Sequence, residues 1–265
     1  MSLLDTHCHL DAYSDPLAVL VAARSANVDL VAVTESPDSF RRFRTRLGRA
    51  PGVSVALGLH PGSTSASSPG QLQRFFRMLP NADWIGEIGL DFNPRVDARD
   101  RRAQYANFSS IVDHELARTL PMSVHSRGAT ADVVAVLEGT GVQAILHWFT
   151  GTTKQAVRAA EAGLWFSVNS AMVRSKGGAR VLAALPHDRL LLETDGPYCS
   201  HRGRPAEPKD LHDVVEQLAH VLGVLPAEAL ELVEANTGRF VRRLGDRDYA
   251  SESSGGSMVS WSTDQ

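Results

Sequence analysis

The chain has 265 residues, of which 43% are hydrophobic, so it can bury the core of one sizeable domain. Its formal net charge of −3 at pH 7 provides no global basic field, so nucleic acid could be bound only by a local patch. Two widely separated cysteines exclude a disulfide framework, and no apolar segment reaches the roughly 18–20 residues of a membrane span. We expect a cytoplasmic protein with no membrane segment.

Apolar segments of strand-like composition alternate with longer amphipathic segments along the chain. The eight expected strands are Leu3–Leu10, Asp29–Glu35, Val53–His60, Trp84–Phe92, Met122–Ser126, Gln143–Phe149, Leu164–Asn169 and Leu190–Thr194. The helices expected between and after them are Pro16–Ala26, Pro69–Leu79, Arg99–Arg118, Thr152–Ala162, Gly178–Leu185, Pro208–Leu222 and Pro226–Leu244. This alternation favours a parallel sheet, and eight units predict an α/β fold of the closed TIM (β/α)8 barrel type, with a doubly wound open sheet as the alternative.

The barrel is expected to form one domain over residues 1–245. Residues 246–265 end in "SESSGGSMVSWSTDQ", whose Ser and Gly content is typical of disordered segments. This tail is therefore predicted to be disordered.

Two histidines lie close to the start of the chain, within the first expected strand, in "LLDTHCHLDA". Alternate side chains of a strand share a face, so His7 and His9 point the same way, roughly 6.6 Å apart along the backbone. Two imidazoles on one face can bind one divalent ion. The alternative is a pair of core or rim histidines without a metal.

Side chains of the same chemical types lie at or near the carboxyl ends of four further expected strands. They are Glu87, His125, His147 and Asp195. Active sites of (β/α)8 barrels gather at that rim, although each residue alone could be a helix cap or a hydrogen-bonded core group. Together with the first two histidines they exceed the three or four protein ligands of one catalytic ion, so the set predicts a two-metal site with one bridging carboxylate.

Six ordered motifs resemble those of a known family. They are "DTHCHLD", "LGLHPG", "GEIGLDF", "VHSR", "LHWFTG" and "LLETDGPY". In this order and spacing they resemble the TatD family of metal-dependent deoxyribonucleases, which are amidohydrolase-type barrels. The resemblance covers about residues 3–240 and implies that His7, His9, Glu87 and Asp195 hold one ion. Glu87, His125 and His147 would hold the other, so that Glu87 bridges.

The activity is implied by this resemblance alone. It is hydrolysis of phosphodiester bonds, expected to be a 3′–5′ exonuclease acting on single-stranded DNA with two divalent ions, Mg²⁺ or Mn²⁺, while Zn²⁺ is also compatible with such ligands. Trp148 in "LHWFTG", where many members carry Cys, and the Ser-rich tail resemble the QatD branch, which belongs to an anti-phage defence system. That branch implies partner subunits of a defence complex.

Several acidic residues have expected roles beside the ions. Glu87 and Asp195 are the candidate catalytic residues, with Asp195 accepting a proton from a metal-activated water as well as binding. Glu193 shares the inward face of Asp195 one layer deeper and could orient a ligand histidine or form a structural ion pair. Asp91 and Asp11 are expected above the metals, Asp91 on the substrate side, with a helix N-cap as the alternative for each.

Other side chains near the expected strand ends could bind the substrate. His60, in "GLHPG", could hydrogen-bond a phosphate, and Arg127 could clamp a phosphate oxygen or form a surface salt bridge. Phe92, Trp148 and Tyr198 could stack on unpaired bases or simply pack at the rim.

The densest positive segment is "RRFRTRLGR", residues 41–49. It lies in an expected outer helix, so a solvated helix face is the favoured interpretation, with docking of DNA or a partner subunit as the alternative.

Two other functions remain open at this point. The same ligand set could hydrolyse a small amide, ester or phosphoester, since it polarises a carbonyl as well as a phosphoryl group. Alternatively, the chain could be mainly a scaffolding subunit of a defence complex.

Overall fold

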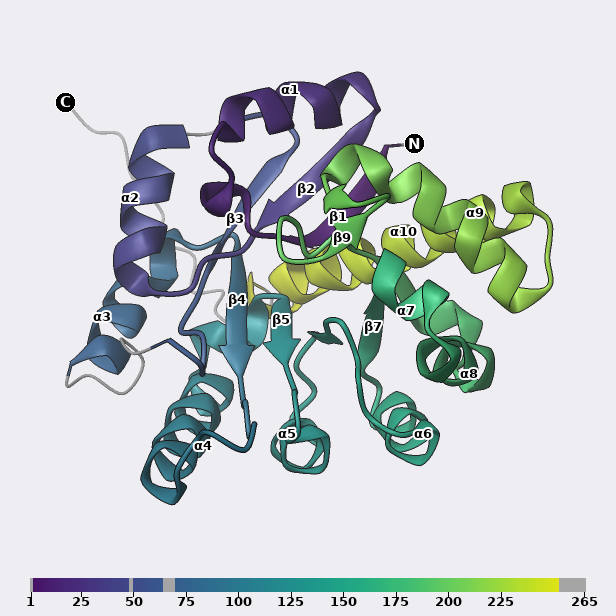
Figure 1. Cartoon of the computed structure of the whole chain (residues 1–265). Coiled ribbons are helices and arrows are strands. Elements are labelled where there is room, and N and C mark those ends of the chain that lie inside the picture. Colours follow the sequence, from purple (N-terminus) through teal and green to yellow (C-terminus); the bar gives the residue numbers. More distant parts are fainter. Residues whose placement is uncertain (1, 48–49, 64–69, 253–265) are drawn as a thin grey trace, which may run out of the picture.

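The computed structural model describes residues 2–47, 50–63 and 70–252. Eight parallel strands pair in sequence order and close on themselves, with helices arranged around them (Figure 1). The strands are β1 (Leu3–Cys8), β2 (Val28–Ala32), β3 (Val53–Leu57), β4 (Trp84–Gly89), β5 (Met122–His125), β6 (Ala144–Leu146), β7 (Trp165–Val168) and β8 (Leu190–Leu192). The pairing of β1 with β8 closes the barrel, so the predicted TIM barrel is confirmed and the open sheet is excluded.

The helices pack on the outside of the strands. They are α1 (Pro16–Ser25), α2 (Pro37–Leu47), α3 (Gln71–Met78), α4 (Ala98–Asp113), α5 (Thr130–Leu137), α6 (Thr153–Glu161), α7 (Ser170–Arg174), α8 (Lys176–Ala184), α9 (Leu211–Leu222) and α10 (Pro226–Glu252). Short 3-10 turns and a small hairpin complete the fold, namely η1 (Leu10–Ala12), η2 (Leu79–Asn81), η3 (Leu116–Thr119), η4 (His187–Arg189), η5 (Pro208–Asp210), β9 (Ser200–His201) and β10 (Arg204–Pro205). Within the described ranges, none of the helices combines the length and apolar character that a bilayer span requires.

The observed helices differ from the predicted ones in several places. The segment predicted as Arg99–Arg118 divides into α4 and η3, because the backbone becomes extended at His114. α5 and α7 were not among the predicted helices. α10 continues past Leu244 to Glu252, so residues 246–252 of the predicted tail are helical. Residues 253–265 and Pro69 lie outside the described residues, and the domain boundary at 245 stays a prediction.

The barrel interior changes from apolar at its amino end to polar at its carboxyl end. On β8, Leu191 belongs to an apolar cluster that Phe240 of α10 joins by packing against Trp84 and Trp165. Two residues further along the same face stands the buried Glu193. Because inward positions recur every second residue, one strand supplies both the apolar plug and the polar layer above it.

The strands end earlier than predicted, and several site residues follow them within three positions. β1 ends before His9, β6 before His147 and β8 before Asp195. Asp195, which follows β8, and Trp148, which follows β6, have positive φ angles of 49° and 35°. The chain therefore turns sharply where these two segments leave the barrel. These turns bring the side chains over the mouth of the barrel.

Gly89 allows β4 and β5 to approach closely beside the site. Its φ is +129°, and a Cβ there would lie 2.2 Å from the backbone oxygen of His125. We expect Gly89→Ala to destabilise the protein by about 3 kcal/mol and to lower its Tm by roughly 6–12 °C. Gly139→Ala is the control, because that glycine has a φ of +76° but nothing within 4 Å of the position that a Cβ would take. Equal losses of Tm in the two variants would contradict a role for the close approach.

Candidate active site

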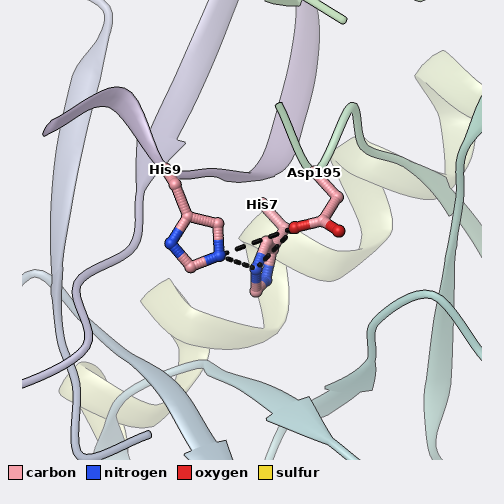
Figure 2. A group of neighbouring side chains, drawn as sticks. All are labelled: His7, His9 and Asp195. Atoms are coloured by element: carbon pink, nitrogen blue, oxygen red, sulfur yellow. Dashed lines mark hydrogen bonds and ion pairs between the residues drawn. The ribbon is translucent and has the colours of Figure 1, made fainter. Parts of the chain in front are cut away.

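The six predicted ligand side chains converge at the carboxyl end of the barrel. Five are buried and His125 is half-buried. We call His7, His9 and Asp195 the first ligand group, and His125 and His147 the second ligand group. Figure 2 shows the side chains of the first group directed toward one another. The predicted inward orientation of both early histidines is therefore what the structure has.

The first ligand group shares one space with a carboxylate oxygen of Glu87. His7 Nε2 lies 3.2 Å from His9 Nε2, and Asp195 Oδ1 lies 3.4 Å and 3.5 Å from these two nitrogens. Glu87 Oε2 lies 3.6 Å from His7 Nε2 and 3.3 Å from His9 Nε2. Four ligands bound at 2.0–2.1 Å in a tetrahedron would stand about 3.3–3.4 Å apart, so these residues fit one divalent ion.

The other oxygen of Glu87 faces the second ligand group. Glu87 Oε1 lies 2.6 Å from His125 Nδ1 and 2.8 Å from His147 Nε2, and these two nitrogens are 3.3 Å apart. His60 Nε2 approaches the same oxygen at 3.3 Å. The donor set of nitrogens around one carboxylate oxygen fits a second ion beside the first. Glu87 thus has the geometry of a bridging ligand.

Burial and neighbouring charges act in opposite directions on the two carboxylates. Burial raises the pKa of Asp195 to about 7. Burial also favours the neutral form of Glu87, but the facing charges of His60 and His147 and the hydrogen bond from His125 hold its pKa well below the usual range. Glu87 is therefore the fixed negative charge of the site, while Asp195 titrates near neutral pH.

Metal binding is expected to release a proton from His125. Burial alone would lower the pKa of this imidazole, but hydrogen bonds to Asp91 and Glu87 raise it to about 9. A histidine must be neutral to bind a metal, so a proton has to leave below pH 9. We expect the apparent metal affinity to rise about tenfold per pH unit from pH 7 toward 9 and then to level off. Calorimetry in buffers of different ionisation enthalpy measures the released proton, and a pH-independent affinity would contradict this assignment.

Buried polar groups hold the ligands from behind. His7 Nδ1 is hydrogen-bonded to Ser123 Oγ at 2.7 Å, which leaves Nε2 facing the cluster. Asp5 accepts hydrogen bonds from the backbone of His7 at 3.2 Å and of Thr194 at 3.0 Å, and so ties β1 to the segment after β8. Metal ligands are commonly oriented by such outer hydrogen bonds. Ser123 and Asp5 were not predicted, although Asp5 lies two residues before His7 on the same strand.

Glu193 lies one layer below the ligands, as the strand alternation indicated. Its carboxylate accepts hydrogen bonds from Ser167, from Asn169 Nδ2 at 2.8 Å and from the backbone N–H of Trp148 at 2.9 Å. It lies 4.0 Å from His147 Nδ1, which is too far for a direct hydrogen bond to that histidine. Burial raises its pKa well above the usual range. Glu193 therefore positions His147 through the backbone of the next residue.

The structure places the two further acidic residues, Asp91 and Asp11, differently. Asp91 Oδ2 lies 3.1 Å from His125 Nε2 in the pocket wall, and the helix-cap alternative is excluded because Asp97 caps α4. Burial opposes ionisation of Asp91, but hydrogen bonds from His125 and the Asn93 backbone lower its pKa to about 2. Asp11 is exposed in η1 and does not line the pocket, nor does it cap a helix. Its charge interacts with that of His9, and its expected place above the metals stays a prediction.

A pocket of about 700 Å³ opens over the ligand cluster. Besides the ligands His9, Glu87, His125, His147 and Asp195, its lining comprises Glu35, His60, Asp91, Ser126, Arg127, Trp148, Thr150 and Tyr198. The predicted substrate-side residues are thus in the pocket wall. Phe92 is not, since it packs beneath the guanidinium of Arg101 at 5.2 Å. Sequence reasoning missed Glu35, Ser126 and Thr150; the position of Glu35 at the end of an expected strand was the available signal.

The arginine-rich segment lies on α2, as predicted. Arg41 pairs with Asp38 at 3.7 Å, and Arg44 pairs with Asp83. Arg49 lies outside the described residues. These pairs agree with the favoured interpretation of a solvated outer helix.

Comparisons with known proteins identify the family. A family profile described as TatD related DNase matches residues 4–242. The chain belongs to the TatD family. Deoxyribonuclease TATDN3 of Homo sapiens is 30% identical to this TatD chain, over 92% of it and 96% of the relative. The uncharacterized metal-dependent hydrolase YcfH of Escherichia coli K12 is also 30% identical, over 91% of this chain and 95% of the relative.

A solved TatD structure has the same fold. The crystal structure of YJJV, a TatD homologue from Escherichia coli K12, matches with a TM-score of 0.79 at 27% identity, over 89% of this chain and 96% of that one. The resemblance inferred from the six motifs is confirmed. This TatD protein is a metal-dependent hydrolase, and its candidate ligands form clusters of the kind that such an enzyme requires.

Proposed function

We propose that this TatD protein is a divalent-metal-dependent deoxyribonuclease that removes nucleotides from the 3′ end of single-stranded DNA. The observation that carries the proposal is the shared carboxylate of Glu87, which faces the first ligand group with one oxygen and the second ligand group with the other. Two neighbouring divalent ions supply an activated water and neutralise the attacking and leaving oxygens, which phosphodiester hydrolysis needs. The first ligand group with Glu87 would hold one ion, and Glu87 with the second ligand group the other.

The identity of the ions is part of the proposal. Imidazole and carboxylate ligands accept Mg²⁺, Mn²⁺ and Zn²⁺, and availability often decides among them. We take Mg²⁺ or Mn²⁺ as the working ions in a cytoplasmic protein, with Zn²⁺ as the alternative.

Asp195 is the group that we assign to proton transfer. Its pKa of about 7 lies near neutral pH, where a general base works best, and it lines the pocket beside the ligands. In this assignment the Asp195 carboxylate accepts a proton from the attacking water, while His7 and His9 hold the ligand geometry.

The pocket wall supplies groups suited to a nucleotide chain. His60 and the exposed Arg127 carry nitrogens that can bind phosphate oxygens. Asp91, in the same pocket wall, orients His125 through a hydrogen bond. Trp148 and Tyr198 offer aromatic faces on which unpaired bases can stack. Stacking requires unpaired bases, so these residues support a single-stranded substrate.

The experiment is a nuclease assay on 3′- and 5′-labelled single-stranded DNA with Mg²⁺ or Mn²⁺. The proposal expects 5′-mononucleotides released from the 3′ end and loss of activity with EDTA. Duplex DNA is the comparison substrate. Metal-dependent cleavage of small amides or esters without any cleavage of DNA would instead identify the binuclear hydrolase alternative.

We further propose a role in anti-phage defence beside partner subunits. Its support is the resemblance to the QatD branch, including Trp148 in the pocket wall. Phage plating on cells that carry the complete system tests it. Loss of protection in Asp195→Asn cells supports an enzymatic role, whereas full protection with normal complex assembly would favour the scaffold alternative.

A further inference from the structure

The substrate pocket carries opposite charges on opposite sides. Around the closed barrel, β2 stands across from β6, because the eight strands pair in sequence order. Glu35 follows β2 and Tyr198 follows β8, whereas Arg127 follows β5 and Trp148 follows β6. All four side chains line the pocket, and the ligand cluster lies between them. The wall beside Glu35 is therefore anionic, while the opposite wall carries the Arg127 guanidinium and the Trp148 ring, with the Asp91 carboxylate next to Arg127.

Glu35 and Tyr198 form a connected pair on the anionic wall. The Tyr198 hydroxyl donates to Glu35 Oε1 at 3.4 Å. The Tyr198 ring meets the His9 ring edge-on, with 4.8 Å between centroids. Tyr198 is 58% exposed and Glu35 is exposed, so both can reach a bound molecule. The Glu35 carboxylate is thus connected to the first ligand group through the side chain of Tyr198.

This asymmetry restricts how a polyanion can enter. A DNA chain carries a negative phosphate at every linkage, and a carboxylate on one wall repels such a charge while Arg127 on the other attracts it. A chain end that carries a free hydroxyl lacks that charge. A terminal hydroxyl is also a donor that a carboxylate accepts well.

We propose that Glu35, oriented by Tyr198, recognises the free 3′-hydroxyl of the terminal nucleotide and rejects a 3′-phosphate. The rest of the strand then leaves along the Arg127 and Trp148 wall. This inference rests on the proposed exonuclease function, and it adds the residue that recognises the 3′ end of the DNA chain. Glu35 is a specificity-determining residue, and Tyr198 is its positioning residue.

The test compares two single-stranded oligonucleotides that differ only in a 3′-hydroxyl or a 3′-phosphate. For the full-length wild-type protein with Mn²⁺ we expect kcat/KM about tenfold or more higher for the hydroxyl end. Glu35→Gln removes the negative charge and keeps the size, so it should reduce the ratio to near one by improving use of the phosphate end. Tyr198→Phe should reduce the ratio by a smaller factor.

Glu138→Gln is the matched control, because it makes the same chemical change at the C-cap of α5, at the other end of the barrel. The control should keep the wild-type ratio. A wild-type ratio near one, or a Glu35→Gln ratio equal to that of the wild type, would overturn the inference.

A binding measurement separates this inference from the nuclease proposal. The last linkage of each oligonucleotide is made a phosphorothioate, which keeps the charge and slows hydrolysis, and affinity is read by fluorescence anisotropy. Preference for the hydroxyl end without any DNA cleavage would support the end recognition and contradict the nuclease function. Cleavage of DNA without discrimination in either measurement would contradict the end recognition alone.

Discussion

Replacing Glu87 by alanine is expected to lower the rate of DNA hydrolysis by about 10³-fold or more, because both ligand groups lose the charge they share. The Glu87 carboxylate lies within 3.6 Å of nitrogens from both groups and is nearly inaccessible to solvent. Without it, a first ion would keep only three of its protein ligands and a second only two. We therefore expect metal content to fall as well as kcat.

Two variants make this result interpretable. Glu87→Gln keeps the volume and one oxygen but loses the charge, so it should retain the fold by circular dichroism and still lose metal. Glu161→Ala, at the last residue of α6 and exposed, should behave as wild type. A Glu87→Ala protein that keeps two ions and more than a tenth of the wild-type rate would contradict the bridging assignment.

Asp195→Asn is expected to lower kcat by about 10²–10³-fold while leaving DNA affinity within about threefold of wild type. Asparagine keeps the shape and one oxygen donor but cannot accept the proton at neutral pH. Asp195 also lines the pocket, but the groups that we assign to phosphate and base binding are other residues, so DNA binding should persist. The acidic limb of the pH–rate profile, which we attribute to a group of pKa about 7, should flatten in the variant.

Asp188→Asn is the matched control for this prediction. Asp188 is exposed and precedes β8, whereas Asp195 follows it, so the same chemical change is made at the opposite end of one strand. The control should retain the wild-type rate and pH profile. If Asp195→Asn lost DNA binding in parallel with kcat, the residue would belong to substrate binding rather than to proton transfer.

Much of the fold and the ligand set followed from local sequence patterns. Parallel strands in a barrel all end at the same rim, so polar residues at the ends of eight apolar segments had to meet there. This reasoning predicted the six side chains that converge there as candidate ligands, and it expected His60, Asp91, Arg127, Trp148 and Tyr198 on the substrate side, where they line the pocket. The strand period also placed Glu193 one layer below this set, whereas its hydrogen bonds to Trp148 and Asn169 were not predicted.

What the tertiary structure alone decided is how these groups pair. The alternation of side chains along a strand predicts the face on which each one lies. The distances between side chains of different strands depend on the closure of the barrel and on the residue at which each strand ends. Three features could therefore not be read from residue spacing. Glu87 directs one carboxylate oxygen to each ligand group, His125 contacts Asp91, and Asp11 lies on η1. The contact between Tyr198 and Glu35 joins residues 163 positions apart. It exists because the ends of β8 and β2 lie on the same side of a closed barrel, which no local pattern encodes.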